Sequence, residues 1–179
     1  MKKTPLCTAA AVVVGAGLFF VLGGFVSLQS PVPGTTVCLQ YGLLAFVAAL
    51  FGPVAGALTG MIGHALIDWQ AGEGIYWSWV IASGCFGVVS GLAAKKMRLW
   101  DGVFGRDDML RFNAWQMIGH ALSFGLAAPL LDILFGETRV RFAFTQGLAA
   151  CLSNIVTTAV LGTLLCLAFA AARPRKPKR

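Results

Sequence analysis

Six long apolar runs constrain the fold of this chain more than any other feature. A helix needs about 20 apolar residues to cross the roughly 30 Å hydrocarbon core of a bilayer. Of the 179 residues, 58% are hydrophobic and 12% are charged, whereas soluble domains carry roughly 25% charged residues. The sequence therefore predicts an all-α integral membrane protein, a single domain with six transmembrane helices at about 6–28, 36–51, 53–69, 75–94, 112–134 and 142–171.

Turn-forming residues separate these runs. The first break, from Ser30 to Gly34, contains two prolines and a glycine, and Gly52-Pro53 makes a tighter one. The second and third runs are short and rich in glycine, so we expect a closely packed or partly re-entrant helical hairpin. The first run is longer than the roughly 7–15 apolar residues of a signal peptide, which indicates a retained membrane helix.

Positive charge predicts the orientation, because cytoplasmic loops retain lysine and arginine. With the N-terminus inside, twelve of the 14 cations are cytoplasmic, and only Arg139 and Arg141 are outside. Both termini are then cytoplasmic, and residues 172–179 form a basic tail. The net charge of +7 does not indicate nucleic-acid binding, because the cations cluster at the ends of apolar runs. The twelve are Lys2, Lys3, Lys95, Lys96, Arg98, Arg106, Arg111, Arg173, Arg175, Lys176, Lys178 and Arg179.

Polar and aromatic residues gather in the predicted outer half of the membrane. Unpaired polar groups cost several kcal/mol in lipid, so these side chains should face protein or an aqueous cavity. Aromatic walls with a few polar anchors are typical of small-molecule sites. The candidate substrate-binding residues are Gln40, Tyr41, His64, Asp68, Trp77, Trp79, Asp132, Gln146 and Asn154.

Structural interpretations compete with this one. Tryptophans also anchor helices at membrane interfaces, and amides also join neighbouring helices. His64 and Asp68 lie four apart on one helical face, so they could pair, contact a substrate or bind a cation. Asp132 could simply be solvated near a helix end, and His120 could serve helix packing.

The sequence lacks the motifs of several enzyme classes. No GxxxxGK[ST] phosphate loop is present, so we expect no ATP hydrolysis by this chain, and HExxH and GxSxG are also absent. The five cysteines show no CxxC spacing, so neither a zinc site nor a disulfide framework is indicated. In the first run, Ala11 and Gly15 lie four apart, a spacing that marks a helix contact face.

Four blocks of sequence resemble the substrate-binding S components of energy-coupling factor (ECF) transporters, which import vitamins into bacteria and archaea. The blocks are FGPVAGALTGMIGHALID at 51–68, WSWVIASGCFGVVSGL at 77–92, APLLDILFGE at 128–137 and FTQGLAACLSNIVTTAVLGTLL at 144–165. Within that family the chain is most similar to the riboflavin-type or unassigned-substrate subgroup. The resemblance implies a six-helix bundle in a prokaryotic cell membrane, with an outward-facing vitamin site closed by loops.

The resemblance also implies partners. S components join a transmembrane coupling subunit and two cytoplasmic ATPases, and they hold no permanent cofactor. A small-residue face on the first helix would dock on the coupling subunit, here through Ala9, Ala10, Ala11 and Gly15, although the family's Ala-xxx-Ala signature is not present. Nickel and cobalt members begin Met-His, whereas this chain begins Met-Lys-Lys, which argues against a metal cargo.

We therefore expect a non-catalytic, vitamin-binding transport subunit. Riboflavin is the leading cargo, with thiamine or its pyrimidine precursor as alternatives, because a flat heteroaromatic ring would suit Tyr41, Trp77 and Trp79. Two other classes remain open: a membrane-embedded enzyme acting on lipid through His64, Asp68 and His120, and a purely structural subunit without a ligand.

Overall fold

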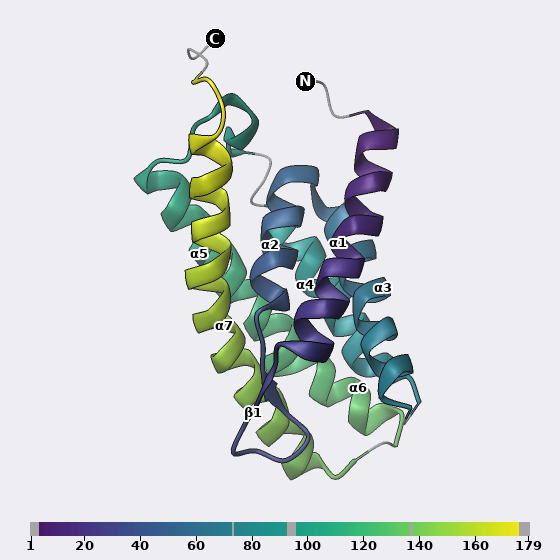
Figure 1. Ribbon diagram of the computed structural model, residues 1–179. Helices are drawn as coiled ribbons and strands as arrows, with labels where there is room; N and C mark the ends of the chain where they lie inside the picture. Colours follow the sequence, from purple (N-terminus) through teal and green to yellow (C-terminus); the bar gives the residue numbers. More distant parts are fainter. Residues whose placement is uncertain (1–3, 73, 93–95, 137, 176–179) are drawn as a thin grey trace.

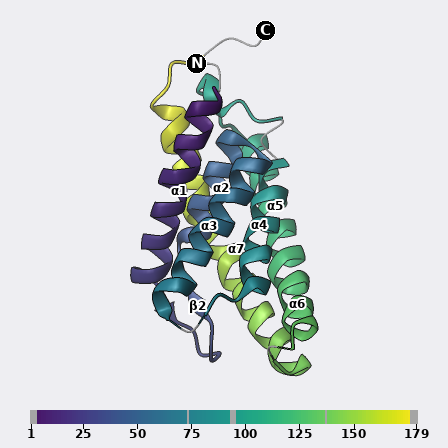
Figure 2. The ribbon, with the colours of Figure 1, turned by 90° about the vertical axis from the view of Figure 1, so that its right-hand side faces the viewer.

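Six helical rods form a bundle in the computed structural model, which describes residues 4–72, 74–92, 96–136 and 138–175. Figures 1 and 2 show the rods running roughly along one direction. The fifth rod is continuous but contains three segments, α5, η3 and α6. The helices are α1 (Pro5–Phe25), α2 (Gln40–Phe51), α3 (Pro53–Ala71), α4 (Trp77–Leu92), α5 (Arg106–His120), η3 (Ala121–Ala127), α6 (Ala128–Leu134) and α7 (Val140–Ala171), with a short 3-10 turn, η2 (Leu99–Asp101).

The fifth rod begins earlier than the apolar run predicted, at Arg106 instead of 112. Its first turn is polar, and the Asp108 carboxylate accepts a hydrogen bond from the Gly105 N–H at 3.1 Å, which stabilises the helix start beyond the apolar run. Near its other end, Pro129 lacks an N–H and interrupts the regular ladder of hydrogen bonds. The π-helical segment η3 lies just before this proline and keeps the rod continuous.

A small β-hairpin lies where the sequence predicted the end of the first helix and the start of the second. Strands β1 (Leu28–Gln29) and β2 (Thr36–Val37) pair antiparallel, with Leu28 opposite Val37. The first helix consequently ends at Phe25 instead of 28, and the second begins at Gln40 instead of 36. The two prolines between the strands prevent either helix from continuing.

The described ends of the chain lie at the same end of the bundle, and the hairpin lies at the opposite end (Figure 1). This arrangement is what an even number of crossings requires. We call the end that carries β1 and β2 the hairpin end. Six spans and cytoplasmic termini stay predictions, and part of the charge pattern behind them falls outside the described residues, at Lys2, Lys3, Lys95, Lys176, Lys178 and Arg179.

The bundle is apolar on its outside, and its buried polar side chains lie inside among the core residues. On α7, large apolar side chains are exposed at every fourth position, whereas Asn154 and Thr158 of the same helix are buried. An exposed apolar surface of this kind is favourable in contact with lipid and unfavourable in contact with water. Within the described residues, three rods are long and apolar enough to cross a membrane, namely Pro5–Phe25, Arg106–Leu134 and Val140–Ala171. The exposed residues of the α7 stripe are Leu148, Leu152, Val156, Val160 and Leu164.

Glycines bring α3 and α4 into close contact. Gly52, at φ 94°, makes the tight turn before α3, so the predicted helical hairpin of the second and third runs is present. A Cβ added at Gly60 would lie 2.6 Å from the carbonyl oxygen of Ser83, and one added at Gly56 would lie 2.5 Å from that of Gly87. The absence of side chains here fixes how the residues of the two helices face one another.

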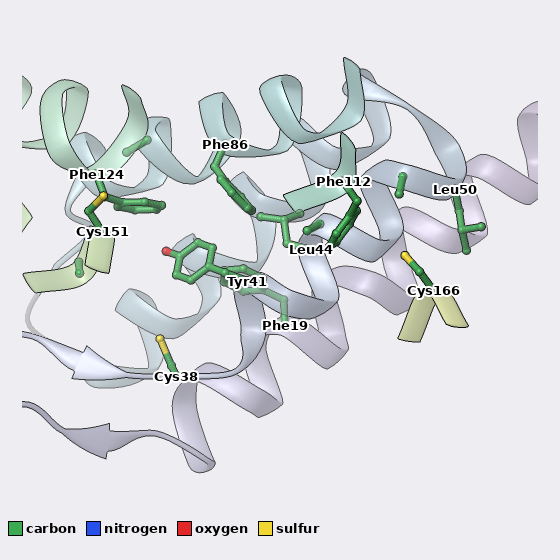
Figure 3. Close-up of a cluster of buried hydrophobic side chains, with 14 of the residues drawn as sticks. Phe19, Cys38, Tyr41, Leu44, Leu50, Phe86, Phe112, Phe124, Cys151 and Cys166 are labelled. Atoms are coloured by element: carbon green, nitrogen blue, oxygen red, sulfur yellow. The ribbon is translucent and has the colours of Figure 1, made fainter. Parts of the chain in front are cut away.

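Aromatic rings fill the centre of the bundle around Tyr41. Its ring meets those of Phe19, Phe86 and Phe124 edge to face, with centroids 5.4, 5.7 and 4.9 Å away. Figure 3 shows these side chains converging from α1, α2, α4 and η3. They belong to the hydrophobic core of the bundle.

Candidate functional site

A cavity of about 430 Å³ opens at the hairpin end of the bundle. This size lies within the roughly 300–1,000 Å³ typical of small-molecule sites. Helices α1, α2, α3, α4, α6 and α7 contribute to its wall, and the loop between β1 and β2 lies along one side. Its lining comprises Gly23, Gly34, Thr35, Thr36, Cys38, Gln40, Tyr41, His64, Ile67, Asp68, Tyr76, Trp79, Asp132, Thr138, Phe142, Gln146, Ala150 and Asn154.

Eight of the nine residues predicted from the sequence line this one cavity. They are Gln40, Tyr41, His64, Asp68, Trp79, Asp132, Gln146 and Asn154. Trp77 is the exception, because it is 52% exposed and does not line the cavity. Trp77 and Trp79 are two residues apart on α4, which turns their side chains to different faces of the helix.

Three side chains, two of them from the cavity wall, join α2, α3 and α4. The Ser83 hydroxyl lies 2.7 Å from His64 Nδ1 and 3.0 Å from the Tyr41 hydroxyl, and the two latter groups are 3.3 Å apart. On the far side of the imidazole, His64 Nε2 lies 3.6 Å from the Asp68 carboxylate. Pairing, one of the three alternatives for His64 and Asp68, is therefore present, within a larger network that fixes the imidazole.

Asp68 also shapes the start of α4. Its Oδ2 accepts a hydrogen bond from the Tyr76 N–H at 3.0 Å, eight residues further along the chain. This bond closes the turn between α3 and α4. It holds Tyr76 against the cavity and places Trp79 one turn inward.

Trp79 reaches across the cavity wall to Asp132 of α6. The indole Nε1 donates to Asp132 Oδ2 at 3.1 Å. Asp132 is 3% exposed, so the alternative of a solvated carboxylate near a helix end is wrong. The bond orients both side chains and joins two helices that are far apart in sequence.

The loop between the strands is tied to α7. Gln146 Nε2 donates to the carbonyl oxygen of Pro33 at 3.0 Å, and Gly34, at φ 70°, leaves room for this amide. Deeper in the cavity, the Cys38 thiol donates to Asn154 Oδ1 at 3.9 Å. Both amides face the cavity, as their spacing of eight residues on α7 predicts.

Sequence reasoning missed other lining residues. Ala150 and Phe142 lie four residues before Asn154 and Gln146, so the same helical spacing could have found them. Thr35 and Thr36 depend on how the loop folds back, which no local pattern encodes. Ser83 does not line the cavity but bonds His64, and it was missed because this contact depends on the register between α3 and α4.

His120 lies outside the cavity lining. Its ring stacks on Phe86 with centroids 4.0 Å apart, and Nε2 hydrogen-bonds the Thr158 hydroxyl at 3.0 Å. Packing is therefore its role, and the catalytic trio considered with His64 and Asp68 is not assembled around the cavity. Among the described residues no group of three or more metal-binding side chains occurs, and Cys7, Cys38, Cys85, Cys151 and Cys166 are free.

The predicted docking residues of α1 do not share one surface. Ala9 and Ala10 are exposed and Ala11 is half-buried. Gly15 is buried, and a Cβ there would lie 3.1 Å from Thr59 of α3. Gly15 therefore serves packing within the chain, and a docking role stays a prediction only for the three alanines.

Comparison with known proteins decides the family. The family model described as "ECF-type riboflavin transporter, S component" matches residues 4–171. The chain belongs to this family. A UPF0397 protein of Enterococcus faecalis is similar, with 42% identity over 175 residues that cover 98% of this S component and 96% of the relative. A UPF0397 protein of Streptococcus pneumoniae is 44% identical over 173 residues, which cover 97% and 94% of the two chains.

Membership makes this S component a subunit of a membrane transporter and not an enzyme. The exposed apolar helices agree with a multi-pass membrane protein. The names of the two relatives do not state a cargo. No solved structure matches the chain.

Proposed function

We propose that this S component captures a small heteroaromatic vitamin in the cavity at the hairpin end, for import across the plasma membrane of a prokaryote. The observation that carries the proposal is the cavity itself. It joins an aromatic wall of Tyr41, Tyr76 and Trp79 to buried polar anchors, in a bundle whose outside is apolar. Flat rings stack on such walls, and the polar groups fix their edges.

Riboflavin is the first compound to test, because the family description names it. Thiamine and its pyrimidine precursor are the second candidates, and two carboxylates in the lining, Asp68 and Asp132, favour them. In each case the vitamin is the transported ligand, and the chain holds no permanent cofactor.

The energy for import must come from partners, since the sequence has no phosphate loop. We infer that a transmembrane coupling subunit and two cytoplasmic ATPases supply it, as the family implies. Ala9 and Ala10 are exposed on α1 and small enough to allow close helix contact. A double Ala9→Leu, Ala10→Leu variant should bind its ligand normally but fail to support uptake by cells that contain the partners. Normal uptake would remove these alanines from the docking surface.

Ligand binding is tested on the full chain purified in detergent. A ligand present at about 100 times its Kd should add roughly 2.7 kcal/mol to the free energy of unfolding. We expect a rise in Tm with one of the candidate vitamins. A yellow chromophore that remains with the protein through purification would identify a flavin.

Two tryptophan variants locate the site. Trp79→Leu removes an indole that lines the cavity, and truncating such an anchor costs about 2 kcal/mol or roughly thirtyfold in Kd. Trp77→Leu removes an exposed indole outside the cavity on the same helix and should leave the Kd unchanged. Equal effects of the two substitutions, or no binding of any vitamin, would reject the proposed site.

A further inference from the structure

The cavity is acidic. Its lining contains two carboxylates, Asp68 and Asp132, and among the described residues no lysine or arginine lines it. Arg139 and Arg141 lie in a neighbouring groove that shares Thr138 and Phe142 with the cavity, and both arginines are exposed to solvent. Screening by water and salt weakens exposed charges much more than buried ones. The buried charge that a ligand meets is therefore negative.

Only one of the two carboxylate oxygens of Asp132 has a hydrogen-bond partner among the described residues. Oδ2 accepts the indole hydrogen bond of Trp79, whereas Oδ1 is buried and has no hydrogen-bond partner within the described residues. A buried, incompletely paired carboxylate costs several kcal/mol, which a cation or a donor group brought by a ligand offsets. The indole of Trp79 orients this carboxylate at the cavity wall, and a small rotation of the side chain would bring Oδ1 to a bound ligand.

The cavity lining contains further buried hydrogen-bond acceptors. Gln40 is 5% exposed, and its Oε1 is buried without a partner among the described residues. Asn154 Oδ1 faces the thiol of Cys38, which is a weak donor. One of the two N–H groups of the Gln146 amide already donates to the carbonyl oxygen of Pro33. A ligand that supplies N–H donors therefore satisfies more of this cavity than one that supplies acceptors.

We propose that the cavity selects a positively charged, amino-bearing heteroaromatic ligand, anchored by Asp132, and rejects anions. This inference rests on the proposed function and concerns the same cavity. Trp79 is the positioning residue for Asp132, and the aromatic wall adds a cation–π attraction to a charged ring. Thiamine has this chemistry, because its thiazolium ring is a cation and its pyrimidine carries an amino group; the pyrimidine precursor shares only the amino group. The ring of riboflavin is neutral, and phosphate esters of either vitamin add negative charge.

Four probes test the charge preference on the full wild-type chain: thiamine, thiamine monophosphate, riboflavin and riboflavin 5′-phosphate. Equilibrium Kd values are measured in detergent at pH 7, with Tm shifts as a second readout. We expect thiamine to bind at least about tenfold more tightly than the other three, since about 1.4 kcal/mol of charge pairing suffices for that ratio. Riboflavin or either phosphate binding as tightly as thiamine would overturn the inference.

A charge-neutral variant tests the anchor. Asp132→Asn keeps the shape of the side chain and an acceptor for Trp79, and it should weaken thiamine binding at least about tenfold without lowering the Tm of the ligand-free protein. Asp107→Asn neutralises an exposed carboxylate in the first turn of α5 and should change neither quantity. Unchanged thiamine affinity in Asp132→Asn would overturn the role of Asp132.

The outcomes separate this inference from the proposed function. Binding of only neutral or anionic probes, with loss of affinity in Trp79→Leu, would overturn the charge preference and leave vitamin capture in the cavity standing. No binding by any of the four probes would count against both. Because the charge preference is measured on the wild-type chain, poor folding of Asp132→Asn does not remove the test.

Discussion

Adding one methyl group at Gly60 should loosen the bundle at its candidate site. In Gly60→Ala the new Cβ would lie 2.6 Å from the Ser83 carbonyl oxygen and 2.9 Å from Leu44 Cδ2. Ordinary contact begins at 3.4 Å, so α4 must move away from α3 by about 0.8 Å. Backbone oxygen cannot rotate aside, unlike the end of a long side chain. The strain therefore falls on the helix–helix contact.

The magnitude follows from two opposing effects. Overpacking a well-packed core costs about 1–3 kcal/mol, whereas replacing glycine by alanine inside a helix gains about 0.5–1 kcal/mol. Gly17→Ala isolates the second effect, because Gly17 lies in α1 with no atom within 4 Å of the added Cβ. Gly60→Ala should thus be about 1–3 kcal/mol less stable than Gly17→Ala. For a chain of this size, that difference lowers Tm by about 2–12 °C.

Ligand binding should fall together with stability. Ser83 Oγ lies 2.7 Å from His64 Nδ1, and a shift of about 0.8 Å along this direction would stretch the contact to about 3.5 Å, where a hydrogen bond is lost. Thermal unfolding in detergent and vitamin affinity are measured on the two variants and the wild type. Equal Tm values for Gly60→Ala and Gly17→Ala would refute the close approach of α3 and α4 on which this reasoning depends.

Two further predictions concern the core and the topology. Thr158→Val removes the hydroxyl bonded to buried His120 and should cost about 1–3 kcal/mol, whereas Thr157→Val, at a half-buried position, should cost about 0.5 kcal/mol or less. Equal Tm values in detergent would contradict this role of the hydroxyl. Arg139→Cys should react with a membrane-impermeant maleimide in intact cells, and Arg106→Cys only after permeabilisation, each measured against the parent chain. The reverse pattern would invert the topology.

Helical spacing predicted the part of the site that lies on single helices. Gln146 and Asn154 are eight residues apart and both line the cavity, and the four-residue spacing of His64 and Asp68 placed both on one face of α3. The prediction that Trp77 lines the pocket was wrong. Tryptophan is common both at membrane interfaces and in aromatic pockets, so its presence in the sequence does not distinguish the two. Two residues separate Trp77 from Trp79, so helix geometry alone argues that they face different ways.

What the sequence could not reveal depends on contacts between distant segments. Ser83 meets His64 only because Gly60 lets α3 and α4 approach closely, and glycine spacing indicates closeness without giving the register. Leu28 of the first strand and both residues of the strand at 36–37 lie at the ends of apolar runs, so hydropathy assigned them to helices. The assignment fails because Pro31 and Pro33 lack the N–H groups that helix continuation requires.

The hydrogen bonding of the cavity divides its polar side chains between structure and binding. In a bundle surrounded by lipid, every buried polar group needs a partner, because water is not available around the helices. The hydroxyls of Tyr41 and Ser83 hydrogen-bond the His64 imidazole and each other. These bonds stabilise the contacts among α2, α3 and α4. Asp132 and Gln40 each keep a buried acceptor without a partner among the described residues. Removing a group of the first kind should lower stability and affinity together, whereas neutralising Asp132 should lower affinity alone, and this difference separates the two roles experimentally.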